Sequence, residues 1–170
     1  MESLRDGDIA LIRARWWLHP LTEYDHAALV WTWQPRLQGE AQYWYSLEAG
    51  FSGVRAYRLA HWPRPFVILR PVCELRVSYD ALTQAMRWLG DPYAWWHLPA
   101  VFRRIMERKR GKQNINTLSE ARVCTELVVD AYRAVGLDLC PGIERPTPDD
   151  IADSKRVEHV GRGGDAACRI

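Results

Sequence analysis

One stretch of this chain reads Arg122-Val123-Cys124-Thr125-Glu126-Leu127-Val128-Val129-Asp130-Ala131-Tyr132, and the rest of the fold can be understood from the helix that it predicts. Its apolar residues recur at the spacing of one helix face, and Gly136 follows where a left-handed residue would end a helix. Peptide dipoles and unpaired amides stabilise a thiolate at a helix N-terminus. We therefore expect a helix that presents Cys124 as a nucleophile, provided that the fold brings a base to it.

The start of this helix decides whether that chemistry is available. Thr117-x-x-Glu120 has the form of a capping box, and a helix that began there would hold Cys124 roughly two turns inside, beyond most of the dipole's reach. A catalytic Cys124 instead requires the helix to begin near Arg122. The prediction is therefore a helix start near Arg122, with Asn114–Ala121 as a loop.

The composition is that of one domain with its own core. The 170 residues are 48% hydrophobic and 26% charged, and the nine tryptophans favour extra core volume over a binding surface. A net charge of +2 is too small to indicate nucleic acid or a membrane surface as a partner. No uncharged stretch approaches the roughly 18 residues of a membrane span, and the N-terminus lacks an apolar signal run. We expect a cytoplasmic protein, with export or delivery by other routes left open.

The four cysteines are scattered, without a Cys-x-x-Cys pair. That spacing argues against structural zinc, and a disulfide framework is not expected in a chain with its own core. We expect no metal and no cofactor. Cys73 follows an apolar strand and reads as a small buried hydrophobe, Cys140 reads as a loop residue, and Cys168 belongs to the tail.

Five strands are predicted in the first seventy residues, at 9–12, 26–33, 42–49, 54–59 and 66–70. The first follows a turn at Gly7-Asp8 and reads as buried on both faces, because it is apolar throughout. The fourth alternates as a half-buried strand does. We expect these strands to form an antiparallel meander.

Helical spacing replaces strand alternation in the rest of the chain. Apolar residues mark one helix face over 82–89 and another over 98–106, and 147–151 has the form of a short capped turn of helix. Strands followed by helices predict an α+β fold in which the sheet packs against helices. The predicted domain covers residues 1–160, and residues 161–170 are expected to form a frayed tail.

The base for Cys124 has to come from one of five histidines: His19, His26, His61, His97 and His159. His26 stands out because it opens an apolar strand directly after polar Tyr24-Asp25. Asp25 is close to it in sequence but points to the other face of the same strand, so it is the weaker partner for the imidazole.

A hairpin between the second and third strands would supply a better partner. If Trp33 lies opposite Ala41, then His26 lies opposite Glu48, and directly paired residues point to the same face. Glu48 would accept a hydrogen bond from one imidazole nitrogen and leave the other for Cys124. A register shifted by one residue would destroy this arrangement.

Several short motifs, taken in order, resemble the YiiX-like permuted papain-like amidases of the NlpC-type branch of the papain-like superfamily. They are Gly7-Asp8-Ile9, Asp25-His26-Ala27-Ala28-Leu29-Val30, Leu47-Glu48-Ala49, Gly53-Val54 and Cys124-Thr125-Glu126-Leu127. Tyr132 with Gly136-Leu137 and the 147–151 stretch resemble the family's C-terminal pattern. In the usual papain-like order the cysteine helix comes first, whereas in the permuted group histidine precedes cysteine, as here. The resemblance covers roughly residues 5 to 160.

The resemblance implies a circularly permuted papain-like fold and a role for each site residue. Cys124 would be the nucleophile, His26 the general base and Glu48 the residue that orients the imidazole. The backbone amide of Cys124 would donate to the oxyanion. Tyr93 resembles a family tyrosine near the cysteine and would line the substrate site.

Three functions fit these expectations. The first is a thiol hydrolase that cleaves a small peptide or amino-acid amide through an acyl-enzyme. The second is an acyltransferase or thioesterase on lipid acyl chains, for which the tryptophans, Trp16-Trp17 and Trp95-Trp96 among them, could form an apolar pocket outside the family's pattern. The third is a non-catalytic papain-like binding module that uses basic Arg103–Lys112, a run that otherwise reads as a solvated face. The oligomeric state stays open.

Overall fold

The structure is a computed structural model of the chain, and it describes residues 4–15, 18, 20–33, 43–50, 52–92 and 123–163. The predicted helix over 98–106 and the predicted loop over 114–121 lie outside these residues. The described residues form an α+β fold, which confirms the predicted class.

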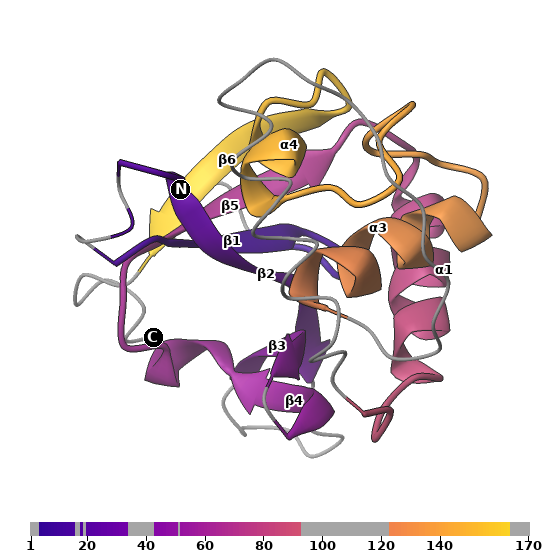
Figure 1. Cartoon of the computed structure of the whole chain (residues 1–170). Helices are drawn as coiled ribbons and strands as arrows, with labels where there is room; N and C mark the ends of the chain where they lie inside the picture. The colour runs from indigo at the N-terminus through magenta and orange to yellow at the C-terminus, as the bar shows by residue number, and fades with distance from the viewer. Residues whose placement is uncertain are drawn as a thin grey trace.

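A six-stranded antiparallel sheet is the centre of the fold (Figure 1). Its strands are β1 (Ile9–Arg13), β2 (Tyr24–Trp33), β3 (Tyr43–Gly50), β4 (Gly53–Arg58), β5 (Phe66–Pro71) and β6 (Val157–Gly163). Their order across the sheet is β4-β3-β2-β1-β5-β6. The first five strands lie where the sequence predicted them.

The predicted meander was wrong in two respects. Only β1 to β4 follow one another across the sheet, because β5 returns and pairs with the free side of β1. A sixth strand then pairs with β5, so residues 161–163, which were predicted to be frayed, belong to the sheet. β6 is an edge strand with mostly exposed or half-buried residues, and such a strand carries little of the apolar alternation that reveals a strand in sequence.

The sheet has a core on each of its faces, as the apolar sequence of β1 predicted. Ile9 and Leu11 belong to a cluster that includes residues of the helices, whereas Ala10 and Ile12 pack with Leu59, Trp62 and other apolar residues on the opposite face. These four residues of β1 are all buried. A strand that is covered on both faces has no side exposed to water, and this explains why residues 9–12 of β1 are all apolar.

Three described helices complete the fold: α1 (Leu75–Met86), α3 (Cys124–Ala134) and α4 (Pro148–Ala152). α1 and α3 lie side by side on one side of the sheet (Figure 1). The apolar face of α3 is fully buried at Leu127, Val128 and Ala131, as its spacing predicted. Gly136, at φ +89°, follows the end of α3 in the left-handed conformation expected there.

The short helix α4 holds the start of β2 in place. Thr147 caps it in a reciprocal capping box with Asp150, which confirms the predicted turn of helix. Asp149 accepts hydrogen bonds from the Thr22 hydroxyl and from the Tyr24 backbone N–H. The strand that carries His26 is therefore fixed at its first residue by a contact from the C-terminal part of the chain.

A buried tyrosine joins α3 to the turn before β1. The Tyr132 hydroxyl donates to the Gly7 carbonyl at 2.6 Å. Gly7 has φ +85°, and a Cβ on it would lie 2.6 Å from the Ser78 carbonyl oxygen on α1. The turn, α1 and α3 therefore meet at a point where only glycine fits.

The Tyr132 contact can be tested without touching the candidate site. We expect Tyr132→Phe to lower the free energy of unfolding by about 1–3 kcal/mol, because it leaves the buried Gly7 carbonyl without its donor. The matched control is Tyr79→Phe on α1. Tyr79 is 57% exposed, so this substitution should change the free energy of unfolding by less than about 0.5 kcal/mol. Urea unfolding of the two variants is the measurement, and equal losses would contradict the prediction.

Candidate active site

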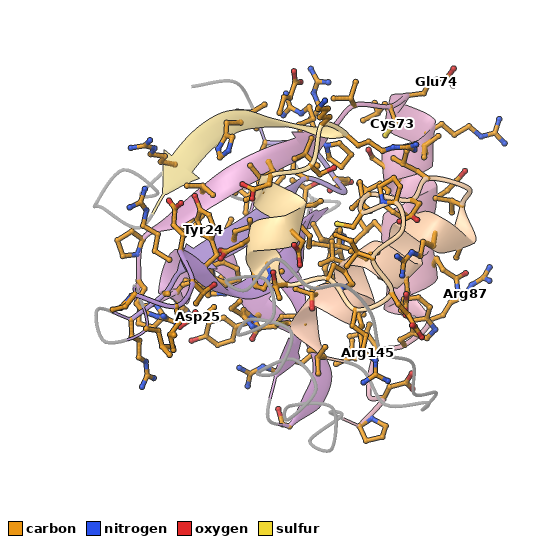
Figure 2. All side chains as sticks on the ribbon, turned by 45° about the horizontal axis from the view of Figure 1, so that its top comes forward. Tyr24, Asp25, Cys73, Glu74, Arg87 and Arg145 are labelled. Carbon is orange, nitrogen blue, oxygen red and sulfur yellow. The ribbon has the colours of Figure 1, made fainter. Side chains whose placement is uncertain are left out.

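Cys124 is the first residue of α3, and Val123 is the N-cap. The prediction of a helix start near Arg122 is thus confirmed to within two residues. The Glu126 carboxylate accepts a hydrogen bond from the Val123 backbone N–H at 3.2 Å and lies 3.9 Å from the Arg145 guanidinium, which is labelled in Figure 2. Cys124 therefore sits at the positive end of the helix dipole, on a first turn that is held by side chains.

The pairing of β2 with β3 ends before it reaches His26 and Glu48. The β2–β3 ladder runs from Trp33↔Tyr43 only as far as Leu29↔Leu47. Beyond that point β2 continues with β1 down to Tyr24, and β3 continues with β4 down to Gly50. β2 and β3 therefore separate, and His26 and Glu48 lie on opposite sides of the gap. α3 contacts both strands.

His26 and Glu48 bridge this opening. His26 Nε2 and Glu48 Oε2 are 2.9 Å apart, which confirms the predicted hydrogen bond. The predicted register was wrong by two residues, since Trp33 pairs with Tyr43 and not with Ala41. A shift of two keeps every side chain on its face, so the two residues still meet, as diagonal neighbours.

The environment of His26 favours the protonated imidazole. Burial alone would lower the pKa of His26, but the charge of Cys124 and a hydrogen bond with it, followed by the hydrogen bond and charge of Glu48, outweigh burial and raise the pKa to about 10. Because Nε2 is held by Glu48, Nδ1 is the nitrogen left for the thiol. The imidazole of His26 therefore lies between the Cys124 thiol and the Glu48 carboxylate.

Arg55 is a fourth member of this cluster that the sequence analysis missed. Its Nε and Nη2 donate to Glu48 Oε1 at 3.0 Å and 2.9 Å. Burial alone would raise the pKa of Glu48, but the hydrogen bond and charge of His26, and then those of Arg55, hold the pKa of Glu48 below its usual value. The signal was present in the sequence, because a two-residue turn between Gly50 and Gly53 places Glu48 directly opposite Arg55.

Trp62 also lies against His26, a contact that no pattern in the sequence predicts. The two rings meet edge to face, with centroids 6.1 Å apart and an interplanar angle of 64°. Trp62 is 7% exposed and packs on Phe66. The indole therefore fixes one side of the imidazole and keeps water from it.

The competing candidates lie elsewhere or are already engaged. Asp25, labelled in Figure 2, pairs with Arg64 at 2.7 Å, in line with its prediction as the weaker partner of His26. His61 and His159 are exposed. Tyr93, His19, His97, the two tryptophan pairs, the basic run 103–112 and Cys168 lie outside the described residues.

The two other described thiols do not share the position of Cys124. Cys73 is half-buried rather than fully buried as predicted, and its Sγ lies 3.4 Å from the Ser78 hydroxyl. Cys140 is a buried residue of the loop before α4, and burial raises the pKa of its thiol to about 12. Of these three thiols, the one at a helix N-terminus beside a histidine is Cys124.

The described residues contain no cluster of His, Cys, Asp and Glu that could hold a metal ion. Within the same residues, no helix has the length and apolar character to cross a membrane.

The protonation of His26 can be measured directly. We expect the imidazole to stay protonated at neutral pH and to lose its proton near pH 10, as followed by its 15N chemical shifts. In Cys124→Ala the pKa of His26 should fall, because the largest contribution that raises it is gone, and Glu48→Gln should lower it less. An unchanged pKa in Cys124→Ala would contradict the contact.

The same shift makes stability depend on pH. The pKa of His26 in the fold lies above the 6.5 of a free histidine, so its protonation stabilises the fold fully below about pH 6.5, and this contribution is lost as the pH rises through about 10. Urea unfolding should show that the wild type has a larger free energy of unfolding than His26→Gln, and that this difference becomes smaller as the pH rises across that range. A difference that grows with pH would contradict this assignment.

Comparison of the chain with models of protein families gives no match. Comparison with curated proteins gives none either. The chemistry of this site therefore has to be argued from its own residues.

Proposed function

We propose that this chain is a cysteine hydrolase that cleaves an amide bond in a small peptide or an amino-acid amide. Cys124 is the nucleophile, His26 the general base and Glu48 the residue that orients the imidazole. The observation that carries the proposal is the position of His26, which is hydrogen-bonded to Glu48 through Nε2 and interacts with Cys124 at the start of α3. This is the nucleophile–base–orienter arrangement of covalent catalysis.

The reaction would run in two stages. The Cys124 thiolate attacks the carbonyl carbon of the substrate, and the protonated imidazole of His26 then gives its proton to the leaving amine as the C–N bond breaks. The acyl group is left as a thioester on Cys124. His26, now neutral, takes a proton from a water molecule that attacks the thioester, and the acid product and the thiolate–imidazolium pair are released.

The start of α3 supplies the remaining requirement. The oxyanion formed in each stage needs donors close to the thiol, and the first backbone amides of a helix have no partner within the helix. Cys124 is the first helical residue, so its own N–H is available for this role. The helix dipole would favour both the thiolate and the oxyanion.

The resemblance to the YiiX-like permuted papain-like amidases supports the choice of an amide substrate. That family places histidine before cysteine in the chain, and here the strands that carry His26 and Glu48 precede the helix that carries Cys124. The permuted papain-like fold is part of the same proposal.

The proposal is tested by trapping the acyl-enzyme. We expect a panel of amino-acid and short-peptide p-nitroanilides to release p-nitroaniline, and the matching p-nitrophenyl esters to leave an acyl adduct on Cys124 that intact-protein mass spectrometry detects. Cys124→Ala should form no adduct and lose turnover. His26→Gln and Glu48→Gln should both slow turnover, the former by about 10²–10⁴-fold because it removes the general base.

Cys73→Ala is the matched control, because it removes another described thiol that is not fully buried and leaves the cluster intact. It should keep both the adduct and the turnover. The proposal is wrong if the adduct forms on another cysteine, or if His26→Gln reacts as fast as the wild type. An ester adduct without amide turnover would keep the nucleophile but replace amide cleavage by acyl transfer or thioester chemistry.

A further inference from the structure

The Glu48 carboxylate is divided between two cationic groups. Its Oε2 lies 2.9 Å from His26 Nε2, and its Oε1 accepts from Arg55 Nε and Nη2 at 3.0 Å and 2.9 Å. Glu48 is 4% exposed, so little water is available to replace either partner. A carboxylate with both oxygens engaged cannot rotate, and its Oε2 is held toward the imidazole.

The position of Arg55 follows from the backbone. β3 and β4 form a hairpin in which Gly50 pairs with Gly53, and two residues farther along Glu48 pairs with Arg55. The guanidinium also lies over the Tyr57 ring, with 5.2 Å from its central carbon to the ring centroid. Because β3 continues with β4 after it has left β2, Arg55 belongs to the edge of the opening that faces His26.

Arg55 balances the charge of the cluster in the proposed reaction. When Cys124 acts as a thiolate beside protonated His26, the negative charges of Cys124 and Glu48 are matched by the positive charges of His26 and Arg55. Among the described residues, the charged side chains that act on Glu48 are His26 and Arg55, and those that act on His26 are Cys124 and Glu48. Without Arg55 a net negative charge would remain in a poorly hydrated site, and uptake of a proton by the thiolate would relieve it.

We propose that Arg55 is a positioning residue of this site, which holds the Glu48 carboxylate turned toward His26 and through this contact raises the reactivity of Cys124. The inference rests on the proposed function, since it concerns the same cluster. Arg55 touches neither the thiol nor the imidazole in any described contact, so its effect has to pass through Glu48.

The test is the pH profile of Cys124 alkylation by iodoacetamide, which needs no substrate. In Arg55→Gln we expect the inflection to move upward by about half to one pH unit, which corresponds to about 3- to 10-fold slower alkylation below the inflection. The shift is kept modest because the Arg55 side chain is 48% exposed and solvent screens its charge. Arg55→Lys should recover part of the shift, because lysine restores the charge but not the two-pronged hydrogen bond.

Arg58→Gln is the matched control. Arg58 lies on the same strand and loses the same charge, but its guanidinium stacks on the Tyr43 ring, 3.9 Å from the centroid, and not on Glu48. Its profile should coincide with that of the wild type. The buried Cys140 reports on folding: if it becomes alkylated in Arg55→Gln, the fold has loosened, and Arg55→Lys then carries the test.

A double variant tests the route of the effect. If Arg55 acts through Glu48, then Glu48→Gln with Arg55→Gln should give the profile of Glu48→Gln alone. The inference is overturned if Arg55→Gln matches the wild type, if Arg58→Gln shifts as far, or if the two changes add. His26→Gln separates the two claims. If its pH profile equals that of the wild type, the proposed function is wrong. If the profile of His26→Gln changes but that of Arg55→Gln does not, only the role of Arg55 is wrong.

Discussion

The separation of β2 from β3 beyond Leu29 and Leu47 is the constraint on which the candidate site depends. A sheet in which β2 and β3 stayed paired would have a closed surface there, and the side chains of His26 and Glu48 would lie on a continuous ladder. The opening instead lets one hydrogen bond between side chains replace the missing backbone pairing. It also brings together the start of α3 and the hairpin that carries Arg55. The cluster of His26, Glu48 and Cys124 thus lies where the regular pairing of β2 with β3 ends.

Much of the secondary structure could be predicted, because each of these local sequence patterns is typical of one kind of element. The five apolar strands, the face of α3, its glycine end and the capped turn at 147–151 were all predicted and all are found. The pairing of His26 with Glu48 survived a register error, because side chains repeat every two residues and the error was two. An error of one would have placed them on opposite faces.

The remaining features depend on packing that a single sequence does not display. The pairing of β5 with β1 depends on which strand of the sheet still has an unpaired edge, and no residue of β5 indicates that strand. β6 was missed because an exposed edge strand shows little apolar alternation. Arg55 was missed for a different reason. The partner expected for Glu48 came from β2, although the hairpin of β3 with β4 has an equally definite register and places Arg55 opposite Glu48.

The late position of α3 in the chain bears on how the protein is made. The strands that carry His26, Glu48 and Arg55 leave the ribosome first, whereas Cys124, the cap of α4 that fixes β2 and the closing strand β6 all follow in the last part of the chain. These contacts join residues far apart in sequence, so they can form only after α3, α4 and β6 have been made. A nascent chain therefore holds His26, Glu48 and Arg55 before Cys124 is made, and the four side chains can come together only after α3 has followed the strands.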